Sequence, residues 1–306
     1  MRLLPPSLPR YEATLGGAFE GEGTGLHTAK HSRVRATPAP AGHGIVFRRR
    51  TRKGVFDVPA LWTNRRSRPL CTALQVGDGP LVRTVEHLMA AFAAHGVDNA
   101  LVEIDGEELP IFDGSAEPWC ERVLAAGRVE LAAPRRYIRV CKRVAYQHKA
   151  HKQRIEPFDG FEMSVAITLS HFGQLKWIGP TDAETFRREL APSRSFGRLK
   201  WALPAKIIGL FWFGEPVLKG ASARNTLALV GAGAVGGLRM PDEPVRHRAL
   251  DMVGDFALAG APLLGRVTAS RPGHEHNYGL LALLMQDRAA WEAVTIGEDG
   301  RPRPAV

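Results

Sequence analysis

Three ionisable residues recur at helical spacing in the segment PVRHRALDMVGD, residues 244–255. His247 and Asp251 are four positions apart, and Asp255 follows four positions later. Residues at this spacing share one face of a helix, and such a polar stripe is costly to bury unless other groups pair with it. A histidine and a carboxylate so placed form a natural bidentate platform for a metal ion. Within this segment alone, a hydrogen-bonded histidine–carboxylate pair on a surface helix is the favoured interpretation.

A second segment, TVEHLMAA, changes that balance because it adds Glu86 and His87. Neighbouring helical residues point about 100° apart, so both cannot face one metal directly. His87 with His247 and Asp251 would give a His₂Asp set with one open position, which is typical of catalytic rather than structural zinc. Glu86 would then serve as the general base that takes a proton from the water activated there.

A further histidine, His274, lies in GHEHN, residues 273–277, which we expect to form a loop. A histidine there could protonate a leaving amine. Asp255 is suited to hold that imidazole in its protonated form, because a nearby carboxylate raises the pKa of histidine.

A glycine-rich stretch, GAGAVGG at 231–237, suggests a different chemistry. It follows the apolar run LALV and matches the G-x-G-x-x-G pattern of dinucleotide-binding proteins, with Asp251 placed 20 positions after Gly231. That pattern requires a helix to begin within the glycines. Pro241 and Pro244 exclude this, since a helix does not continue through them. We therefore predict a glycine-rich turn, and interpret Asp251 as a metal ligand.

Six motifs follow one another along the chain: GTGLHT, TVEHLMAA, DNALVEIDGEELPIFDGSAEPW, SRSFG, PVRHRALDMVGD and RPGHEHN. In type and order they resemble the motifs of one enzyme family, the UDP-3-O-acyl-N-acetylglucosamine deacetylases. The chain resembles this family from about Ala18 to Ile296. The resemblance implies a zinc amidase of lipid A biosynthesis, which releases acetate from a UDP-linked, 3-O-acylated N-acetylglucosamine. A paralogue acting on another N-acetyl sugar and a zinc-less regulatory relative are the alternatives.

The resemblance also implies roles for individual residues. The zinc ligands are His87, His247 and Asp251, the base is Glu86, and the acid is His274, oriented by Asp255. Ser195 occupies the position of a family threonine that donates a hydrogen bond to the tetrahedral oxyanion, and a serine hydroxyl can do the same. Phe196 would pack against the substrate.

Three departures from the family pattern concern the nucleotide part of the substrate. Arg248 replaces the usual lysine that contacts substrate phosphate, and arginine keeps the charge with a different geometry. Leu169 stands where an aromatic residue would stack on uracil. The stretch Gly231–Gly237 replaces a polar, Asp-rich turn.

The resemblance implies that an α+β fold of two similar domains, which we place at 1–132 and 133–306, positions these residues. It implies that in each domain a β-sheet is layered against two helices, with the active site at the domain interface. Residues 16–60 alternate between strand-like runs and turns, and 130–140 reads as a linker followed by a new strand. Further strand-like runs occupy 99–106, 165–170 and 263–270. Hydrophobic periodicity predicts helices over 84–96, 115–127, 182–190, 244–259 and 279–293. Thr84 is the expected N-cap of the first and Gly96 its end.

Composition limits the partners and the compartment. The 306 residues carry a formal net charge of +10, which favours an anionic partner, although solubility alone would also explain it. We expect a diphosphate substrate, transient contact with an acidic membrane surface, no nucleic acid and a monomeric state. Three cysteines without a C-x-x-C pair, and no secretory or membrane-spanning segment, predict a cytoplasmic protein. The stretch 200–215 could line a passage for the acyl chain, or it could be ordinary core.

Overall fold

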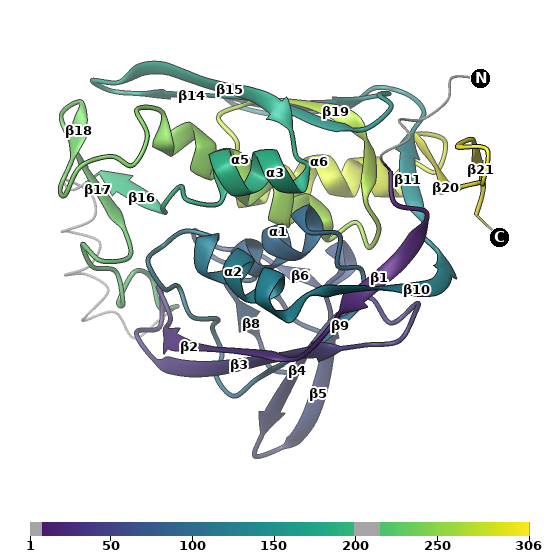
Figure 1. The fold of residues 1–306 in the computed structure, drawn as a ribbon. Helices are drawn as coiled ribbons and strands as arrows, with labels where there is room; N and C mark the ends of the chain where they lie inside the picture. The colour runs from purple at the N-terminus through teal and green to yellow at the C-terminus, as the bar shows by residue number, and fades with distance from the viewer. Residues whose placement is uncertain (1–7, 199–214, 306) are drawn as a thin grey trace.

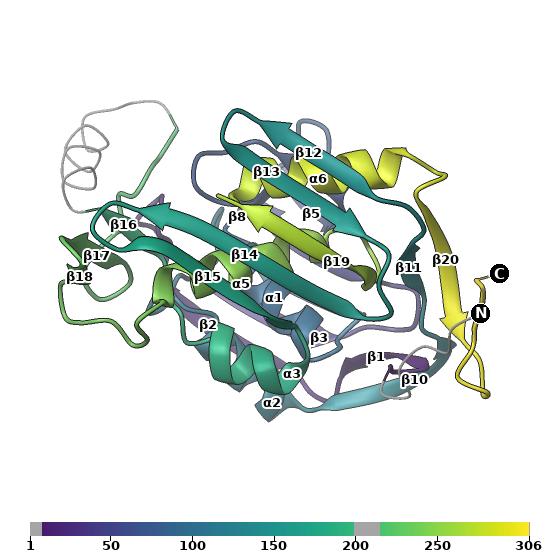
Figure 2. The ribbon, with the colours of Figure 1, turned by 90° about the horizontal axis from the view of Figure 1, so that it is seen from above.

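The computed structural model describes residues 8–198 and 215–305. Two sheets form the outer layers, and two layers of helices lie between them (Figure 1). Seen from above, the sheet of the second half covers helices α5 (Glu243–Ala257) and α6 (His274–Gln286) (Figure 2). The acyl-passage prediction falls on 200–215, and all of that stretch except Glu215 lies outside the described residues.

The first sheet alternates buried and exposed side chains. In β3, Val34 and Ala36 are fully buried, whereas Arg33 and Arg35 point outward. This period of two is expected for a sheet with one face against helices and the other in water. Its strands in spatial order are β2 (Phe19–Thr24), β3 (His31–Pro38), β9 (Ala100–Ile104), β4 (Ile45–Thr51) and β5 (Gly54–Pro59). These confirm the strand-like runs predicted in this half.

Helices α1 (Glu86–Ala94) and α2 (Glu117–Ala126) cover the inner face of this sheet. The prediction that Thr84 caps the first helix is wrong. Thr84 has a φ of 58°, and its hydroxyl donates to Glu108 at 2.9 Å, so α1 begins two residues later. The end of α2 is as predicted, because Gly127 stops it with a φ of 74°.

The second sheet is larger and is organised around β19 (Leu263–Ser270). This strand pairs in antiparallel fashion with β13 (His151–Glu156) and in parallel fashion with β14 (Phe161–Leu169) and β11 (Tyr137–Val140). The other strands are β11 (Tyr137–Val140), β12 (Val144–His148), β13 (His151–Glu156), β14 (Phe161–Leu169), β15 (Gly173–Pro180), β20 (Trp291–Ile296) and β21 (Pro302–Pro304).

Helices α5 (Glu243–Ala257) and α6 (His274–Gln286) cover its inner face. The prediction for α5 is confirmed to within two residues. The prediction for the last helix, 279–293, is wrong at both ends. The carbonyl of Gly273 accepts from the N–H groups of His276 and Asn277, so α6 begins before the predicted loop has ended. Gly279 lies within the helix, where an added Cβ would come within 2.4 Å of the Tyr146 ring.

Shorter elements link the two halves. β1 (Tyr11–Leu15) and β10 (Arg128–Pro134) form a two-stranded ribbon. One small sheet consists of β6 (Arg65–Arg66), β7 (Ala73–Leu74) and β8 (Val82–Arg83), and another of β16 (Phe196–Arg198), β17 (Leu227–Val230) and β18 (Gly233–Ala234). The helical turns are a 3₁₀ turn at Trp62–Asn64 and α3 (Ala183–Thr185), which continues into a π-helical turn at Phe186–Leu190. The predicted α+β fold with two sheet-plus-helix halves is confirmed. A domain boundary at 132/133 stays a prediction.

The glycine-rich stretch forms the predicted turn between two strands. Gly231, with a φ of 56°, connects β17 to β18, and these two strands pair in antiparallel fashion. The next helix, α5, begins at Glu243, beyond the glycines. A helix N-terminus that could bind a pyrophosphate is therefore missing at this turn, which removes the dinucleotide interpretation. Within the described residues, every helix is too short or too polar to cross a membrane.

Candidate metal centre and active site

The two inner helix layers meet where α1 crosses α5. Gly254 of α5 faces the backbone of α1 so closely that an added Cβ would lie 2.0 Å from the carbonyl oxygen of Glu86. Only a residue without a side chain allows this approach. The crossing brings the second residue of α1, His87, to the polar face of α5.

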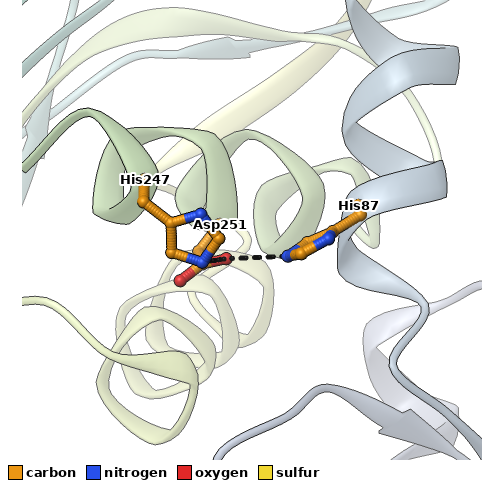
Figure 3. A group of neighbouring side chains, drawn as sticks. All are labelled: His87, His247 and Asp251. Atoms are coloured by element: carbon orange, nitrogen blue, oxygen red, sulfur yellow. Dashed lines mark ion pairs between the residues drawn. The ribbon is translucent and has the colours of Figure 1, made fainter. Parts of the chain in front are cut away.

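His87, His247 and Asp251 come together at this crossing, all of them buried (Figure 3). Each offers one ligand atom, and these atoms lie within 4.8 Å of one another. The Oδ1 atom of Asp251 is 3.6 Å from Nε2 of His87 and 3.4 Å from Nε2 of His247. The three predicted ligands thus surround one point, as a shared metal ion requires.

The hydrogen bonds around these residues suit a metal ion. Oδ1 of Asp251 is buried and has no hydrogen-bond partner among the described residues, although a buried carboxylate oxygen normally has one. Its Oδ2 accepts from Arg248 at 3.2 Å. Nδ1 of His247 donates to the carbonyl of Ser193 at 3.0 Å, which makes Nε2 the unprotonated nitrogen that can bind a metal. A ring held in this way by a backbone carbonyl is usual for metal-bound histidine.

The electrostatics of the three residues point the same way. Burial disfavours the charged form of Asp251, but His247 and His274 outweigh it and hold the pKa of the carboxyl well below its usual range. Burial lowers the pKa of His247 to about 4, so this imidazole is neutral at physiological pH. Burial lowers the pKa of His87, yet the neighbouring carboxylates of Asp251 and Glu86 outweigh it and raise the pKa of that ring. An anionic oxygen between two imidazoles is a ligand set that Zn²⁺ accepts.

Glu86 lies beside this group as the first residue of α1. Its Oε2 accepts from the backbone N–H of Thr72 at 3.0 Å, and its Oε1 is 3.8 Å from Nε2 of His274. Burial raises the pKa of Glu86 to about 7, against the opposing charges of His274 and His87. A carboxyl with a pKa near the working pH can both take and return a proton.

His274 neighbours Glu86, and the structure corrects its predicted position. It is the first residue of α6 rather than part of a loop, so its backbone is held by a helix. Nδ1 of His274 contacts Oδ2 of Asp255 at 3.0 Å, and Nε2 lies 4.0 Å from Oδ2 of Asp251. Burial lowers the pKa of this histidine, but Asp255, Asp251 and Glu86 outweigh it and raise the pKa to about 10. The ring is therefore a proton donor aimed at the candidate metal centre.

Two residues that contact Asp255 were not predicted from the sequence. The hydroxyl of Thr72 donates to Oδ1 of Asp255 at 2.5 Å, and Nδ2 of Asn277 donates to Oδ2 at 2.7 Å. Asn277 in turn accepts from Nε2 of Gln153. Its position three residues after His274 on one helix face could have identified it. Thr72 lies 183 residues from Asp255 in the chain and carries no local pattern.

Ser195 lies between the π-helical turn and β16, and Phe196 is the first residue of β16. Oγ of Ser195 is 3.3 Å from Nε2 of His247, and the backbone N–H of Ser195 donates to Gly114 at 2.7 Å. The Phe196 ring stands edge-on to His247 with centroids 6.1 Å apart. The Arg248 guanidinium lies 4.9 Å from the centroid of the Phe196 ring. The structure therefore places both predicted substrate contacts beside the candidate metal centre, whereas Leu169 ends β14 in the hairpin with β15.

The fold and the site define a class of hydrolase-like proteins: two α+β halves with a candidate metal centre between their helix layers, flanked by a carboxylate and a carboxylate-paired imidazole. Residues 12–286 match the family model described as UDP-3-O-acyl N-acetylglycosamine deacetylase. The chain is 37% identical over 289 residues to UDP-3-O-acyl-N-acetylglucosamine deacetylases of Brucella melitensis, Brucella ovis and Brucella canis. These alignments cover 93% of this chain and 98% of each relative. The chain belongs to the UDP-3-O-acyl-N-acetylglucosamine deacetylase family.

Proposed function

We propose that this protein is a zinc-dependent deacetylase of lipid A biosynthesis. Its substrate would be a UDP-linked, 3-O-acylated N-acetylglucosamine, from which it hydrolyses the acetamide to acetate and a free amine. The observation that carries the proposal is the buried His₂Asp group of His87, His247 and Asp251, with Glu86 and His274 on one side. The names of the relatives supply the substrate class.

The residues of the site divide the reaction between them. A zinc ion held by the His₂Asp group would supply Lewis acidity toward water and the acetamide carbonyl. Glu86 takes the proton of the attacking water through Oε1, while Thr72 holds its Oε2. The hydroxyl of Ser195 donates to the carbonyl oxygen as negative charge develops on it. His274 then protonates the nitrogen through Nε2 as the C–N bond breaks.

The remaining residues are assigned to the nucleotide-sugar part of the substrate. Phe196 offers an apolar face beside His247, and Arg248 carries a guanidinium that can grip a phosphate through two hydrogen bonds. The formal charge of +10 suits an anionic substrate and brief contact with an acidic membrane surface. We further propose a cytoplasmic monomer without nucleic-acid binding.

Acetate release from the 3-O-acylated UDP sugar tests this function, with and without a chelator and with added Zn²⁺. We expect activity that the chelator abolishes and Zn²⁺ restores. Glu86→Ala and His274→Ala should each lower kcat by roughly 10²–10⁴-fold with the metal retained. Near wild-type turnover in either variant would reject the role of that residue.

The same assay separates the alternatives. Faster turnover of a non-nucleotide N-acetyl sugar would indicate a paralogue with another substrate. Purified protein that holds no zinc and gains no activity when zinc is added would indicate a regulatory relative.

A further inference from the structure

We propose that Thr72 is a positioning residue that sets the geometry between the general base and the general acid from the opposite half of the molecule. The inference rests on the proposed function and goes beyond it, since Thr72 is neither a metal ligand nor a reacting group. Thr72 belongs to the first half, whereas Asp255 and His274 belong to α5 and α6 of the second. It therefore connects the catalytic groups across the interface.

Thr72 contacts three members of the site with two of its groups. Its backbone N–H donates to Oε2 of Glu86 at 3.0 Å. Its hydroxyl lies 2.5 Å from Oδ1 of Asp255 and 3.2 Å from Nδ1 of His274. The residue is 2% exposed, so water does not replace these contacts.

The direction of each hydrogen bond follows from the chemistry of the groups. An ionised carboxylate only accepts, so the single hydroxyl proton of Thr72 goes to Oδ1 of Asp255. Oδ2 of Asp255 already accepts from Asn277 and His274. The hydroxyl oxygen of Thr72 remains as a second acceptor beside the Nδ1–H of His274. Both carboxylate oxygens of Asp255 thus accept hydrogen bonds, which fixes the orientation of the carboxylate plane.

The backbone of Thr72 is itself held in place. Thr72 directly precedes β7, a strand paired on both sides with β6 and β8, and its carbonyl accepts from the N–H of Val85 at 3.3 Å. Val85 directly precedes α1, the helix that carries Glu86. A displacement of Thr72 would therefore move Glu86, the base, and at the same time weaken the contacts that hold Asp255 and His274, the acid, in place.

Removing only the hydroxyl tests the inference. Thr72→Val preserves shape and the backbone N–H, but leaves Oδ1 of Asp255 buried without its donor. We expect kcat to fall about 10–100-fold, as is typical for a lost partner of a site residue, with KM within about 3-fold of wild type. Thr72→Ser keeps the hydroxyl and should return kcat to within about 3-fold of wild type.

A double-mutant cycle distinguishes this role from a structural one. If Thr72 acts through Asp255, Thr72→Val should lower kcat no further in an Asp255→Asn background. Metal content and Tm are measured for each variant. If the valine variant does not fold, the same double-mutant cycle is carried out with Thr72→Ala. Wild-type kcat in T72V, a serine variant as impaired as the valine variant, or full additivity with D255N would each overturn the inference. Failure of the wild-type protein to release acetate would instead refute the proposed function.

Discussion

The substitution Gly254→Ala tests how closely the candidate metal centre depends on the approach of α1 and α5. The new Cβ would lie 2.0 Å from the carbonyl oxygen of Glu86 unless the two helices separate. Reaching an ordinary contact of 3.4 Å requires a shift of about 1.4 Å. The atoms in conflict are backbone, so no side chain can turn away to make room.

That shift moves His87 relative to His247 and Asp251, because Glu86 and His87 are consecutive residues. Ligand distances in a metal site tolerate only about 0.2 Å, so we expect metal affinity to fall at least 10-fold. Overpacking of this kind lowers the free energy of unfolding by about 1–3 kcal/mol. The loss would appear although alanine is intrinsically favoured over glycine inside a helix by about 0.5–1 kcal/mol.

Zinc affinity from competition with a chromophoric chelator, and unfolding free energy from urea titration, measure both effects. Gly17→Ala is the control, since its Cβ would lie at an ordinary contact distance of 3.7 Å from the carbonyl oxygen of Ala126. The control should change neither quantity. Wild-type zinc affinity and stability in G254A would show that the close helix crossing does not hold the ligands in place.

Three further perturbations probe the surrounding structure. Glu243→Gln removes the charge from a fully buried side chain that accepts from Arg194 at 2.8 Å, and should lower the unfolding free energy by about 1–3 kcal/mol; an unchanged urea midpoint would contradict this. Burial and the charge of the stacked His151 lower the pKa of His276, so the unfolded chain binds that proton more readily and stability should decline as pH falls below about 6.5. Urea midpoints of His276→Gln should decline less over that range, and equal slopes in the two proteins would refute the cause. Removal of metal should lower Tm and added Zn²⁺ should raise it, because Oδ1 of Asp251 lacks a protein partner within the described chain; a Tm indifferent to both treatments would reject the metal centre.

Local patterns in the sequence predicted much of the chemistry. His247, Asp251 and Asp255 share one helix face because their spacing matches the helical repeat, and α5 has nearly the predicted length. The prolines after the glycine-rich stretch excluded a dinucleotide cradle for a reason that needs no tertiary structure. These features depend on residues that are close together in the chain, so they can be predicted from the amino-acid sequence.

Other features were predicted wrongly because packing decided them. Gly279 looks like a helix boundary, but it lies inside α6, where the Tyr146 ring occupies the space a side chain would need. Thr84 is of a residue type that is common at helix N-caps, but its hydroxyl donates to Glu108 and the helix begins at Glu86. In both cases a residue distant in the chain outweighed the local preference.

The sequence by itself determined which groups could bind a metal, accept a proton and donate one, because residue type and helical spacing set that chemistry. The tertiary structure alone decided how they meet. His87 joins His247 and Asp251 only because Gly254 lets α1 and α5 touch. Thr72 reaches Asp255 across 183 residues of chain, and no local pattern encodes a contact that forms only when two halves pack together.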